Sequence, residues 1–278
     1  MKLSIITVNL NNCEGLKDTV LSVVSQSYND YEYIIIDGCS SDGSVEWIKK
    51  YSTEYPRISW ISEKDSGVFN AMNKGIAMSS GEFLLFLNSG DYLVDGDVLT
   101  HVFSVEIDSD VLLGRLRISK NSHQDSILEP LSKYSLKYFI NNSIAHQAAF
   151  IKRDLFYRFG LYQEEYQFIG DWAFFVNALV LNDGSVCPLD IIVSDYNLDG
   201  MSSDSHNAKK IQEEKQRFYC QYHLKSIVLD YFSWEQWIYE HRVMVWAWNK
   251  RWIRVPLEFA YHFLRRIKQV KQGFCSIH

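Results

Sequence analysis

Three polar segments of the chain contain residue types that bind nucleotides, diphosphates and metal ions. They are Asp37–Gly43, Glu63–Lys74 and Asn88–Asp91. A carboxylate at the end of a buried strand commonly accepts hydrogen bonds from ribose hydroxyls or from a base edge. Asp37 is therefore a candidate for nucleotide binding, although an Asx-turn before a helix would use the same residues.

The second segment combines acids, amides and a lysine. Asn70, Asn73 and Lys74 fall at i, i+3 and i+4 spacing, so they share one face of a predicted helix. Amides and a cation on one face suit a sugar or a diphosphate, whereas a solvent-exposed face without a ligand has the same composition. Both interpretations stay open for this face.

The third segment places a carboxylate after the apolar run Phe83–Leu87. Mg²⁺ takes one or two protein carboxylates together with phosphate oxygens, and Asp91 is placed to supply one. Gly90 would let the backbone approach a ligand closely. A plain turn at this position is the alternative.

The apolar pattern predicts the elements that position these segments. Buried strands are expected at Leu3–Val8, Tyr33–Ile36, Ile58–Ile61 and Phe83–Leu87, and helices at Leu16–Ser27, Val45–Tyr51 and Val68–Ser79. This alternation predicts an α/β fold with a parallel, doubly wound sheet. In such sheets the ligand crevice lies at the C-terminal ends of the strands, which is where the polar clusters fall.

The pattern after residue 110 is less regular. We expect strands at Val111–Ile118, Val186–Leu189 and Ile191–Tyr196, helices at Leu136–Ile140, Asp154–Phe159 and Trp172–Leu181, and a polar, exposed helix at Asn207–His223.

Taken in order, the motifs resemble glycosyltransferase family 2, and within it the bacterial members that build O-antigen, capsule or exopolysaccharide. The matching segments are Thr7-Val-Asn9, Asp37-Gly-x-Ser-Ser-Asp-Gly43, Glu63-x-Asp65-x-Gly67, Asn70-Ala-Met-Asn-Lys-Gly75 and Leu87-Asn-Ser-Gly-Asp91. The match covers roughly residues 1–200. The resemblance implies an inverting enzyme with the A-type glycosyltransferase fold, which is Rossmann-like and has a mostly parallel central sheet flanked by helices.

The resemblance also implies roles on the donor side. Asp91 would be the acidic ligand of Mn²⁺ or Mg²⁺, although many members have Asp-x-Asp-Asp where this chain has Asn88-Ser-Gly-Asp91. The residues implied to bind the nucleotide are Thr7, Asn9, Asp37, Asp65, Asn70, Lys74, Ser89 and Gly90.

On the acceptor side, Ile169-Gly-Asp-Trp172 resembles the Glu-Asp motif of the family, with Gly170 in place of the Glu. Asp171 would be the base that removes the proton of the acceptor hydroxyl. The alternative from the residues alone is that Asp171 caps the following helix. The candidates for contact with the acceptor or the donor sugar are His146, Gln147, Gly170, Trp172 and His206. A mobile loop is expected at Gly200-Met-Ser202.

Composition excludes several classes of protein. Hydrophobic residues make up 47% of the 278 residues, which is enough for a sizeable core. The five cysteines form no CxxC, so neither a disulfide framework nor a zinc site is expected, and a reducing compartment fits. The N-terminal apolar run is too short for a signal peptide, and no apolar run is long enough to span a membrane.

The C-terminal part differs from the rest in charge. From Arg242 onward the sequence carries +7, whereas the whole chain has a formal net charge of −6. Five of the eight tryptophans lie within Trp234–Trp252, a composition typical of a helix lying on an anionic membrane. A helical hairpin packed on the domain or on a second subunit is the alternative, and a homodimer is one form of it. Nucleic acid is not expected as a partner.

These observations predict a glycosyltransferase domain at residues 1–205, with a nucleotide-sugar half (1–110) and an acceptor half (111–205). A helical, basic and aromatic extension is expected at 206–278. The predicted function is metal-assisted transfer of a sugar from a nucleotide-sugar, UDP by default, to a glycan or lipid-linked acceptor at the cytoplasmic face of the inner membrane. A non-catalytic nucleotide-sugar binding module is the alternative, and a nucleotidyltransferase is disfavoured because Asn9–Gly15 lacks a glycine-rich, basic phosphate loop.

Overall fold

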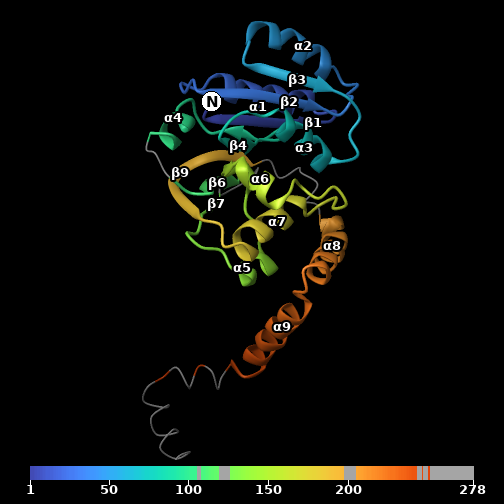
Figure 1. Cartoon of the computed structure of the whole chain (residues 1–278), viewed down its shortest axis with the longest axis vertical. Helices are drawn as coiled ribbons and strands as arrows, with labels where there is room; N and C mark the ends of the chain where they lie inside the picture. Colours follow the sequence, from blue (N-terminus) through green and yellow to red (C-terminus); the bar gives the residue numbers. More distant parts are fainter. Residues whose placement is uncertain (105–107, 119–125, 197–204, 243–245, 247–249, 251–278) are drawn as a thin grey trace, which may run out of the picture. The chain divides into compact units, whose positions relative to one another are not determined.

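The computed structural model describes residues 1–104, 108–118, 126–196, 205–242, 246 and 250. The chain divides into two compact units, Met1–Phe218 and Tyr219–His278, which are described separately (Figure 1). The predicted boundary after residue 205 stays a prediction.

The first unit alternates strands and helices. Its strands are β1 (Leu3–Asn9), β2 (Tyr31–Asp37), β3 (Ile58–Ser62), β4 (Phe83–Phe86), β5 (Tyr92–Leu93), β6 (Val111–Ile118), β7 (Ser126–Leu128), β8 (Ala149–Lys152) and β9 (Val186–Tyr196). Its helices are α1 (Cys13–Val24), α2 (Ser44–Glu54), α3 (Val68–Met78), α4 (Val98–Val102), α5 (Leu136–Asn141), α6 (Asp154–Phe159), α7 (Gly170–Phe175) and α8 (Ala208–Gln221). Helix α8 belongs to this unit as far as Phe218. The short turns η1 (His146–Ala148), η2 (Val176–Leu181) and η3 (Ser205–Asn207) complete it.

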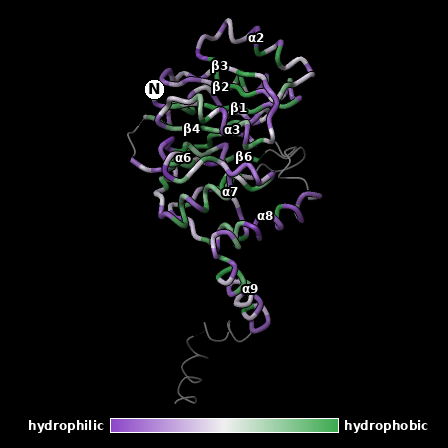
Figure 2. Tube along the Cα trace, turned by 45° about the vertical axis from the view of Figure 1, so that its right-hand side comes forward, coloured by the Kyte–Doolittle hydropathy of each residue, from purple (hydrophilic) through white to green (hydrophobic). Residues whose placement is uncertain are grey.

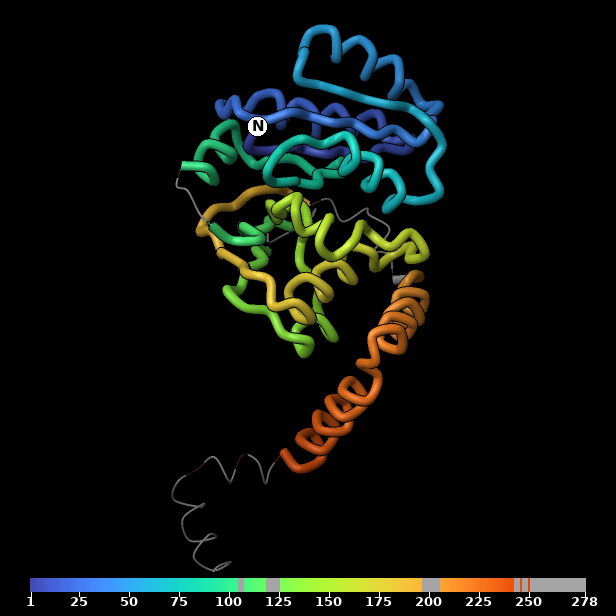
Figure 3. Tube along the Cα trace, in the orientation of Figure 1, coloured from blue at the N-terminus to red at the C-terminus, as the bar shows by residue number. Residues whose placement is uncertain are grey.

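One sheet runs through this unit in the order β3-β2-β1-β4-β8-β6-β9-β5, with β7 paired to β6. The strands β3, β2, β1 and β4 are parallel to one another, as expected. From β8 onward the sheet is mixed, because β8 pairs antiparallel with both β4 and β6 while β9 runs parallel to β6. Figure 3 shows the two parts side by side, β1–β4 in blue to teal and β6–β9 in green to gold.

The strands β1, β2 and β4 are buried on both faces, as a sheet covered by helices requires. All seven residues of β1 are buried. Leu3 and Ile5 belong to the core that includes Leu16 and Val20 of α1. On the other face, a Cβ added to Gly75 of α3 would lie 2.4 Å from the Ile6 side chain, so this helix approaches β1 closely. Figure 2 shows the hydrophobic residues concentrated in these strands.

Two details in the second half differ from the prediction. The two expected strands at Val186–Leu189 and Ile191–Tyr196 form one strand, β9, because β6 pairs with both parts across an irregular register near Arg115. The helix expected at Trp172–Leu181 begins at Gly170 and changes to a wider, π-helical turn at Val176.

Helix α9 (Lys225–Glu240) is the main described element of the second unit. Most of its side chains are exposed, including Trp234 and Trp237, whose rings stack 5.2 Å apart. Trp246 is exposed, and Trp248 and Trp252 lie outside the described residues. In the described part of the chain, no helix is both long enough and apolar enough to cross a membrane.

Candidate functional site

Three polar residues lie side by side at the C-terminal ends of β1, β2 and β3. Two of them, Asn9 and Asp37, are predicted to bind the nucleotide. The strand registers pair Asn9 with Asp37 and Asp37 with Ser62. Asn9 donates its side-chain amide to Asp37 Oδ1 over 2.9 Å, and the Ser62 hydroxyl donates to Asp37 Oδ2 over 2.7 Å. The Ser40 backbone N–H also donates to Oδ2, over 3.0 Å. Asp37 therefore ties the strand ends to the loop that follows β2.

The hydrogen bonds around Asp37 favour the ionised form of its carboxyl. Burial alone would raise the pKa of its carboxyl, but the hydrogen bonds from Ser40, Ser62 and Asn9 outweigh that effect and lower the pKa below the ordinary value. A buried carboxylate with these donors is a rigid, negatively charged part of the site. Asp37 is fully buried in this structure, and Ser40 of the loop after β2 contacts it.

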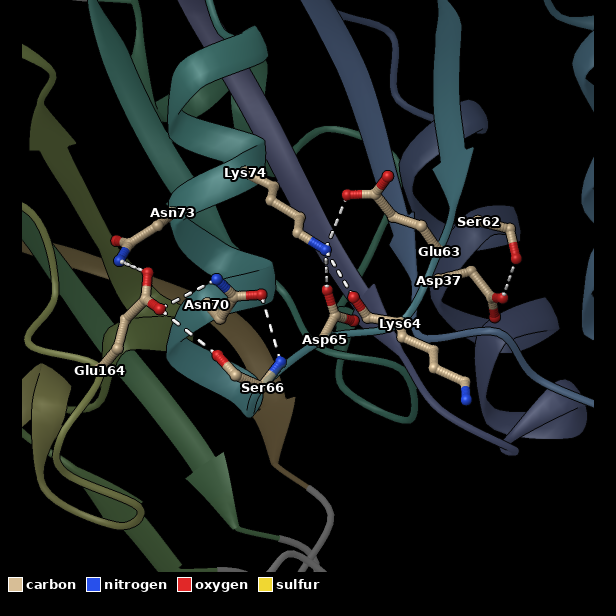
Figure 4. A network of polar contacts seen from close by, with 10 residues as sticks. All are labelled: Asp37, Ser62, Glu63, Lys64, Asp65, Ser66, Asn70, Asn73, Lys74 and Glu164. Atoms are coloured by element: carbon tan, nitrogen blue, oxygen red, sulfur yellow. Dashed lines mark hydrogen bonds and ion pairs between the residues drawn. The ribbon is translucent and has the colours of Figure 1, made fainter.

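Lys74 of α3 joins the Asp65 segment to the helix (Figure 4). Its Nζ lies 2.6 Å from Asp65 Oδ1, 2.8 Å from Glu63 Oε1 and 3.0 Å from the carbonyl oxygen of Lys64. An ammonium has three N–H donors, so these contacts engage all of them. Asp65 also faces the loop after β2, because a Cβ on Gly38 would lie 3.0 Å from Asp65 Oδ2.

The amides of the same helix face are held by an acid that the sequence analysis did not single out. Glu164 accepts from Asn70 Nδ2 and from Asn73 Nδ2, each over 2.9 Å (Figure 4). The Asn70 side-chain oxygen accepts from the Ser66 backbone, and that of Asn73 from the Tyr162 backbone. In this structure the amide face therefore binds the loop before α7, and nucleotide binding by Asn70 stays a prediction.

Thr7 lies inside the sheet. Its side chain is fully buried, and its hydroxyl donates to the Leu87 carbonyl over 2.6 Å and lies 2.9 Å from the Tyr33 hydroxyl. In this structure Thr7 thus supports the arrangement of β1, β2 and β4. A nucleotide contact by Thr7 stays a prediction.

A cavity of about 590 Å³ brings the predicted metal ligand and the predicted base together. Its polar lining comes from the turn after β4 and from η1 and α7, and it includes Asn88, Ser89, Asp91, His146, Gln147, Asp171 and Trp172, with Asn12 from the loop before α1. Asn9, Asp37 and Asp65 do not line it. The predicted residues therefore fall into two groups, a strand-end cluster (Asn9, Asp37, Asp65, Lys74) and the cavity.

The turn Asn88–Asp91 has a defined shape. The Asp91 backbone N–H donates to the Asn88 carbonyl, and the Gly90 N–H donates to the Thr19 hydroxyl of α1, each over 2.9 Å. Gly90 has φ = 104°, which only glycine adopts without strain. The Ser89 carbonyl accepts from Asn12 Nδ2 over 2.9 Å. These contacts hold the turn beside the cavity, which Ser89 and Asp91 line. Nucleotide binding by Ser89 and Gly90 and metal binding by Asp91 stay predictions.

The donor set at this turn fits a hard divalent cation that also binds phosphate oxygens. Asp91 is buried and supplies a carboxylate. The buried Asn88 Oδ1 has no hydrogen-bond partner among the described residues, and amide oxygens are suitable ligands for Mg²⁺ or Mn²⁺. Within the part of the chain that the structure describes, no cluster of three or more His, Cys, Asp or Glu residues forms a complete metal site. The remaining ligands would have to come from a diphosphate and water.

His146 and Asp171 form a pair on the other side of the cavity. His146 Nδ1 lies 2.9 Å from Asp171 Oδ2. Burial lowers the pKa of His146, but the hydrogen bond with Asp171 and the negative charges of Asp171 and Asp91 raise it above the ordinary value overall. Ile169 holds the cap position of α7, and Asp171 lies within the first turn, where its Oδ1 accepts from the Trp172 backbone N–H over 2.8 Å. The role of Asp171 as the base therefore stays a prediction, and support of the helix start stays its alternative.

Gly170, which replaces the usual Glu, is required by packing. A Cβ at this position would lie 2.7 Å from the Phe69 ring of α3. Phe69 is buried and cannot move away freely. A glutamate side chain therefore does not fit this backbone, which explains the departure from the motif.

Helix α8 supplies two buried polar residues that the sequence analysis missed. We expected this helix to be exposed, but Glu214, Lys215 and Phe218 are buried. Lys215 lines the cavity with Ile211, so the site extends beyond residue 205. The signal in the sequence was the spacing of Ile211, Lys215 and Phe218 at i, i+4 and i+7, which marks one helix face.

The other acceptor-side predictions have different outcomes. Gln147 and Trp172 are buried, and both line the cavity. His206 lies in η3, is exposed and does not line the cavity. The predicted loop Gly200-Met-Ser202 lies outside the described residues.

Comparison with known proteins identifies relatives of the chain. The profile described as Glycosyl transferase family 2 matches residues 4–159. The PGL/p-HBAD biosynthesis glycosyltransferase of Mycobacterium bovis (strain BCG / Pasteur 1173P2) is 28% identical over 198 residues, which cover 70% of this chain and 76% of that relative. The putative teichuronic acid biosynthesis glycosyltransferase TuaG of Bacillus subtilis (strain 168) is 37% identical over 89 residues, covering 32% of this chain and 35% of that protein.

Solved structures share the fold. S. aureus TarS 1–349 in complex with UDP-GlcNAc has a TM-score of 0.59 at 20% identity, covering 74% of this chain and 61% of that chain. The mannosyltransferase PcManGT from Pyrobaculum calidifontis, in complex with GDP-Man and Mn²⁺, has a TM-score of 0.55 at 14% identity, covering 73% and 58%. The chain thus spans less than two thirds of either structure. The predicted α/β, A-type glycosyltransferase fold is confirmed, and since the family profile matches more than half of the sequence, the chain belongs to glycosyl transferase family 2.

Proposed function

We propose that this protein transfers a sugar from a nucleotide-sugar to a hydroxyl group of a glycan or lipid-linked acceptor during synthesis of a bacterial surface polysaccharide. The observation that carries the proposal is one cavity lined both by the Asp91 turn and by the His146–Asp171 pair. A group-transfer site needs these two functions at opposite ends of the reacting bond. They are charge neutralisation on the leaving group and a base at the acceptor.

The donor would bind from the strand-end cluster to the Asp91 turn. Asp65, after β3, would accept hydrogen bonds from the base or the ribose, whereas Asp37, which accepts from Asn9, Ser40 and Ser62, would hold the strand ends in place beside it. UDP is the first choice for the nucleotide, since TarS was solved with UDP-GlcNAc, and GDP is the second, since PcManGT was solved with GDP-Man. When bound, Mn²⁺ or Mg²⁺ would be held by Asp91 and the Asn88 side-chain oxygen and would neutralise charge on the diphosphate.

Asp171 would act on the acceptor in an inverting displacement. The acceptor hydroxyl loses its proton to Asp171 Oδ2 while its oxygen forms a bond to the anomeric carbon. The bond from that carbon to the diphosphate breaks, and its electron pair leaves with the diphosphate. His146 stands 2.9 Å from the same carboxylate and would orient it. Tyr138, which also lines the cavity and is half-buried, would offer an aromatic face for a sugar ring.

The second unit would bring the enzyme to its acceptor. The proposed location is cytoplasmic and peripheral, at the inner face of the inner membrane. The exposed aromatic side chains of α9 and the basic residues from Arg242 onward support contact with an anionic lipid surface. A homodimer through the same aromatic side chains is the competing proposal. The relatives named for PGL/p-HBAD and teichuronic acid biosynthesis make a surface glycan the preferred product class.

Replacement of Asp171 by Asn tests the function. A thermal-shift screen of UDP-, GDP- and dTDP-sugars, with and without Mn²⁺, first selects the donor, because a ligand that binds the native state raises the melting temperature. Release of nucleoside diphosphate from that donor is then measured with a bacterial lipid fraction as acceptor. Asp171→Asn should lower the rate by a factor of about 100 or more, since it removes the base, and should leave the donor-induced thermal shift intact.

Asp154→Asn is the matched control, because Asp154 also lies in the first turn of a six-residue helix but is exposed and does not line the cavity. Equal turnover by Asp171→Asn and Asp154→Asn would exclude Asp171 as the base. Donor binding without any turnover by the wild type would favour the non-catalytic binding module instead.

A further inference from the structure

Glu214 of α8 binds the backbone that leads into the first turn of α7. Its carboxylate accepts from three consecutive N–H groups, those of Gln167 over 2.8 Å, Phe168 over 3.0 Å and Ile169 over 3.3 Å. The residue is 6% exposed. Arg217 Nη2 lies 3.5 Å from the same carboxylate, so its charge is partly balanced.

These contacts end two residues before Asp171. Ile169 holds the cap position of α7 and has no side-chain oxygen that could cap the helix itself. The short loop before the helix therefore depends on a carboxylate from a helix more than forty residues later in the chain. Because the peptide units from Ile169 to Asp171 follow one another directly, any movement of this segment also moves the Asp171 side chain.

The next residue of α8, Lys215, contacts the residue that follows Asp171. Lys215 Nζ lies 3.3 Å and 3.5 Å from the carbonyl oxygens of Phe139 and Ile140, at the end of α5. Trp172 donates its indole N–H to the Phe139 carbonyl over 2.8 Å, and Lys215 lies over the Trp172 ring, 4.7 Å from its centroid. Asp171 therefore stands between a segment bound by Glu214 and a tryptophan bound beside Lys215.

We infer that Glu214 is a positioning residue of the transferase site, which holds the Gln167–Ile169 segment so that Asp171 reaches both His146 and the acceptor hydroxyl. The inference rests on the proposed function only where it assigns Asp171 as the base. Its geometric part, that Glu214 maintains the Asp171–His146 contact, can be tested without any substrate. A purely structural Glu214 would affect stability but would leave this contact unchanged in the folded protein.

The test compares Glu214→Gln with Glu213→Gln in the full-length protein. Glutamine has the size of glutamate, but it has one acceptor oxygen in place of two, and its NH₂ group would face backbone N–H donors. Glu213 is its exposed neighbour on the same helix, paired only loosely with Lys209 at 3.9 Å. Both proteins are first shown to be folded from their thermal unfolding, and Glu214→Asp, which keeps the charge, serves as a second variant.

The substrate-free measurement uses the ring ¹⁵N chemical shifts of His146 at one pH in the presence of EDTA, assigned by loss of the signal in His146→Gln. The Nδ1 contact with Asp171 sets these shifts, and Asp171→Asn defines their values when the carboxylate is absent. Glu214→Gln should move them at least halfway to the Asp171→Asn values, Glu214→Asp by less, and Glu213→Gln not at all. Wild-type shifts in folded Glu214→Gln would overturn the inference.

The kinetic measurement uses the donor selected by the thermal-shift screen. Displacement of a reacting group by about 1 Å costs up to about 100-fold in rate, so Glu214→Gln should lower kcat by about 10- to 100-fold. The KM for the donor should stay within about twofold of the wild-type value. The reason is that Glu214 binds the Gln167–Ile169 backbone and not the strand-end cluster. If Asp171→Asn retains turnover, the proposed function fails, while the His146 shifts still decide the role of Glu214.

Discussion

Lys215 makes the unfolding free energy of this protein depend on pH in a direction opposite to that of an ordinary surface lysine. Its ammonium group is buried beside Trp172 and the end of α5. Burial lowers the pKa of Lys215 from 10.5 to about 8, and the charge of Asp171 offsets only part of that effect. The folded chain therefore releases this proton at a lower pH than the unfolded chain.

The magnitude follows from the two pKa values. One pKa unit corresponds to about 1.4 kcal/mol, so the fall from 10.5 to about 8 corresponds to about 3 kcal/mol. Below pH 8 both states hold the proton, and the folded state bears the full cost of burying the charge. Between pH 8 and 10.5 the unfolded state binds more protons than the folded state, so the unfolding free energy contributed by Lys215 rises with pH.

Lys215→Met removes the titrating group and keeps most of the apolar stem. We expect the difference in unfolding free energy, wild type minus variant, to increase by about 3 kcal/mol between pH 7 and pH 10.5. Urea titrations at several pH values measure it. The lost bonds to Phe139 and Ile140 should add a contribution to this free-energy difference that does not change with pH. The Phe139 carbonyl keeps its bond from Trp172.

Lys209→Met is the control, since Lys209 is exposed on the same helix. Its difference from the wild type should stay flat over this pH range. A flat difference for Lys215→Met as well would refute the claim that Lys215 is buried as a charge in the folded protein.

Two further substitutions test the packing that supports the site. Gly170→Ala should lower the unfolding free energy by about 1–3 kcal/mol, because its Cβ would overlap the Phe69 ring. Phe69→Leu in the same chain should restore part of the loss. An unchanged melting temperature in the Gly170→Ala protein would contradict this packing. Thr7→Val should cost about 1–3 kcal/mol in urea unfolding, because the buried hydroxyl bonds to Leu87 and Tyr33 are lost. A Thr7→Val protein with wild-type stability but weaker binding of the selected nucleotide-sugar would instead support a ligand contact.

Much of the fold could be predicted because its signals are local. The runs that form β1, β2 and β4 are apolar and end in polar turns, and the predicted bounds agree with the structure to within a few residues. Val111–Ile118 and Asp154–Phe159 were predicted with the bounds that the structure has. Asp91, His146 and Asp171 were chosen because their motifs resemble a family, and the structure brings all three to one cavity.

The contacts of the polar residues could not be predicted, since their partners lie far away in the sequence. Asn70 and Asn73 have the spacing of a ligand-binding face, but Glu164, about ninety residues later, accepts their amide hydrogens. Glu214 and Lys215 are charged residues in a polar helix, and composition alone places such residues in solvent. Only the packing of α8 against the segments around Asp171 explains their burial.

The sequence by itself determined the order of strands and helices and the polar turns at the strand ends. Those features depend on hydrophobic periodicity and turn chemistry, which act over a few residues. The tertiary structure decided which carboxylates line the cavity and which lie elsewhere. Asp37 is enclosed by its own hydrogen bonds, whereas Asp171 lines the cavity in contact with His146. The physical reason is that burial and hydrogen bonding of a charge depend on neighbours that the register of the sheet and the packing of α8 bring together.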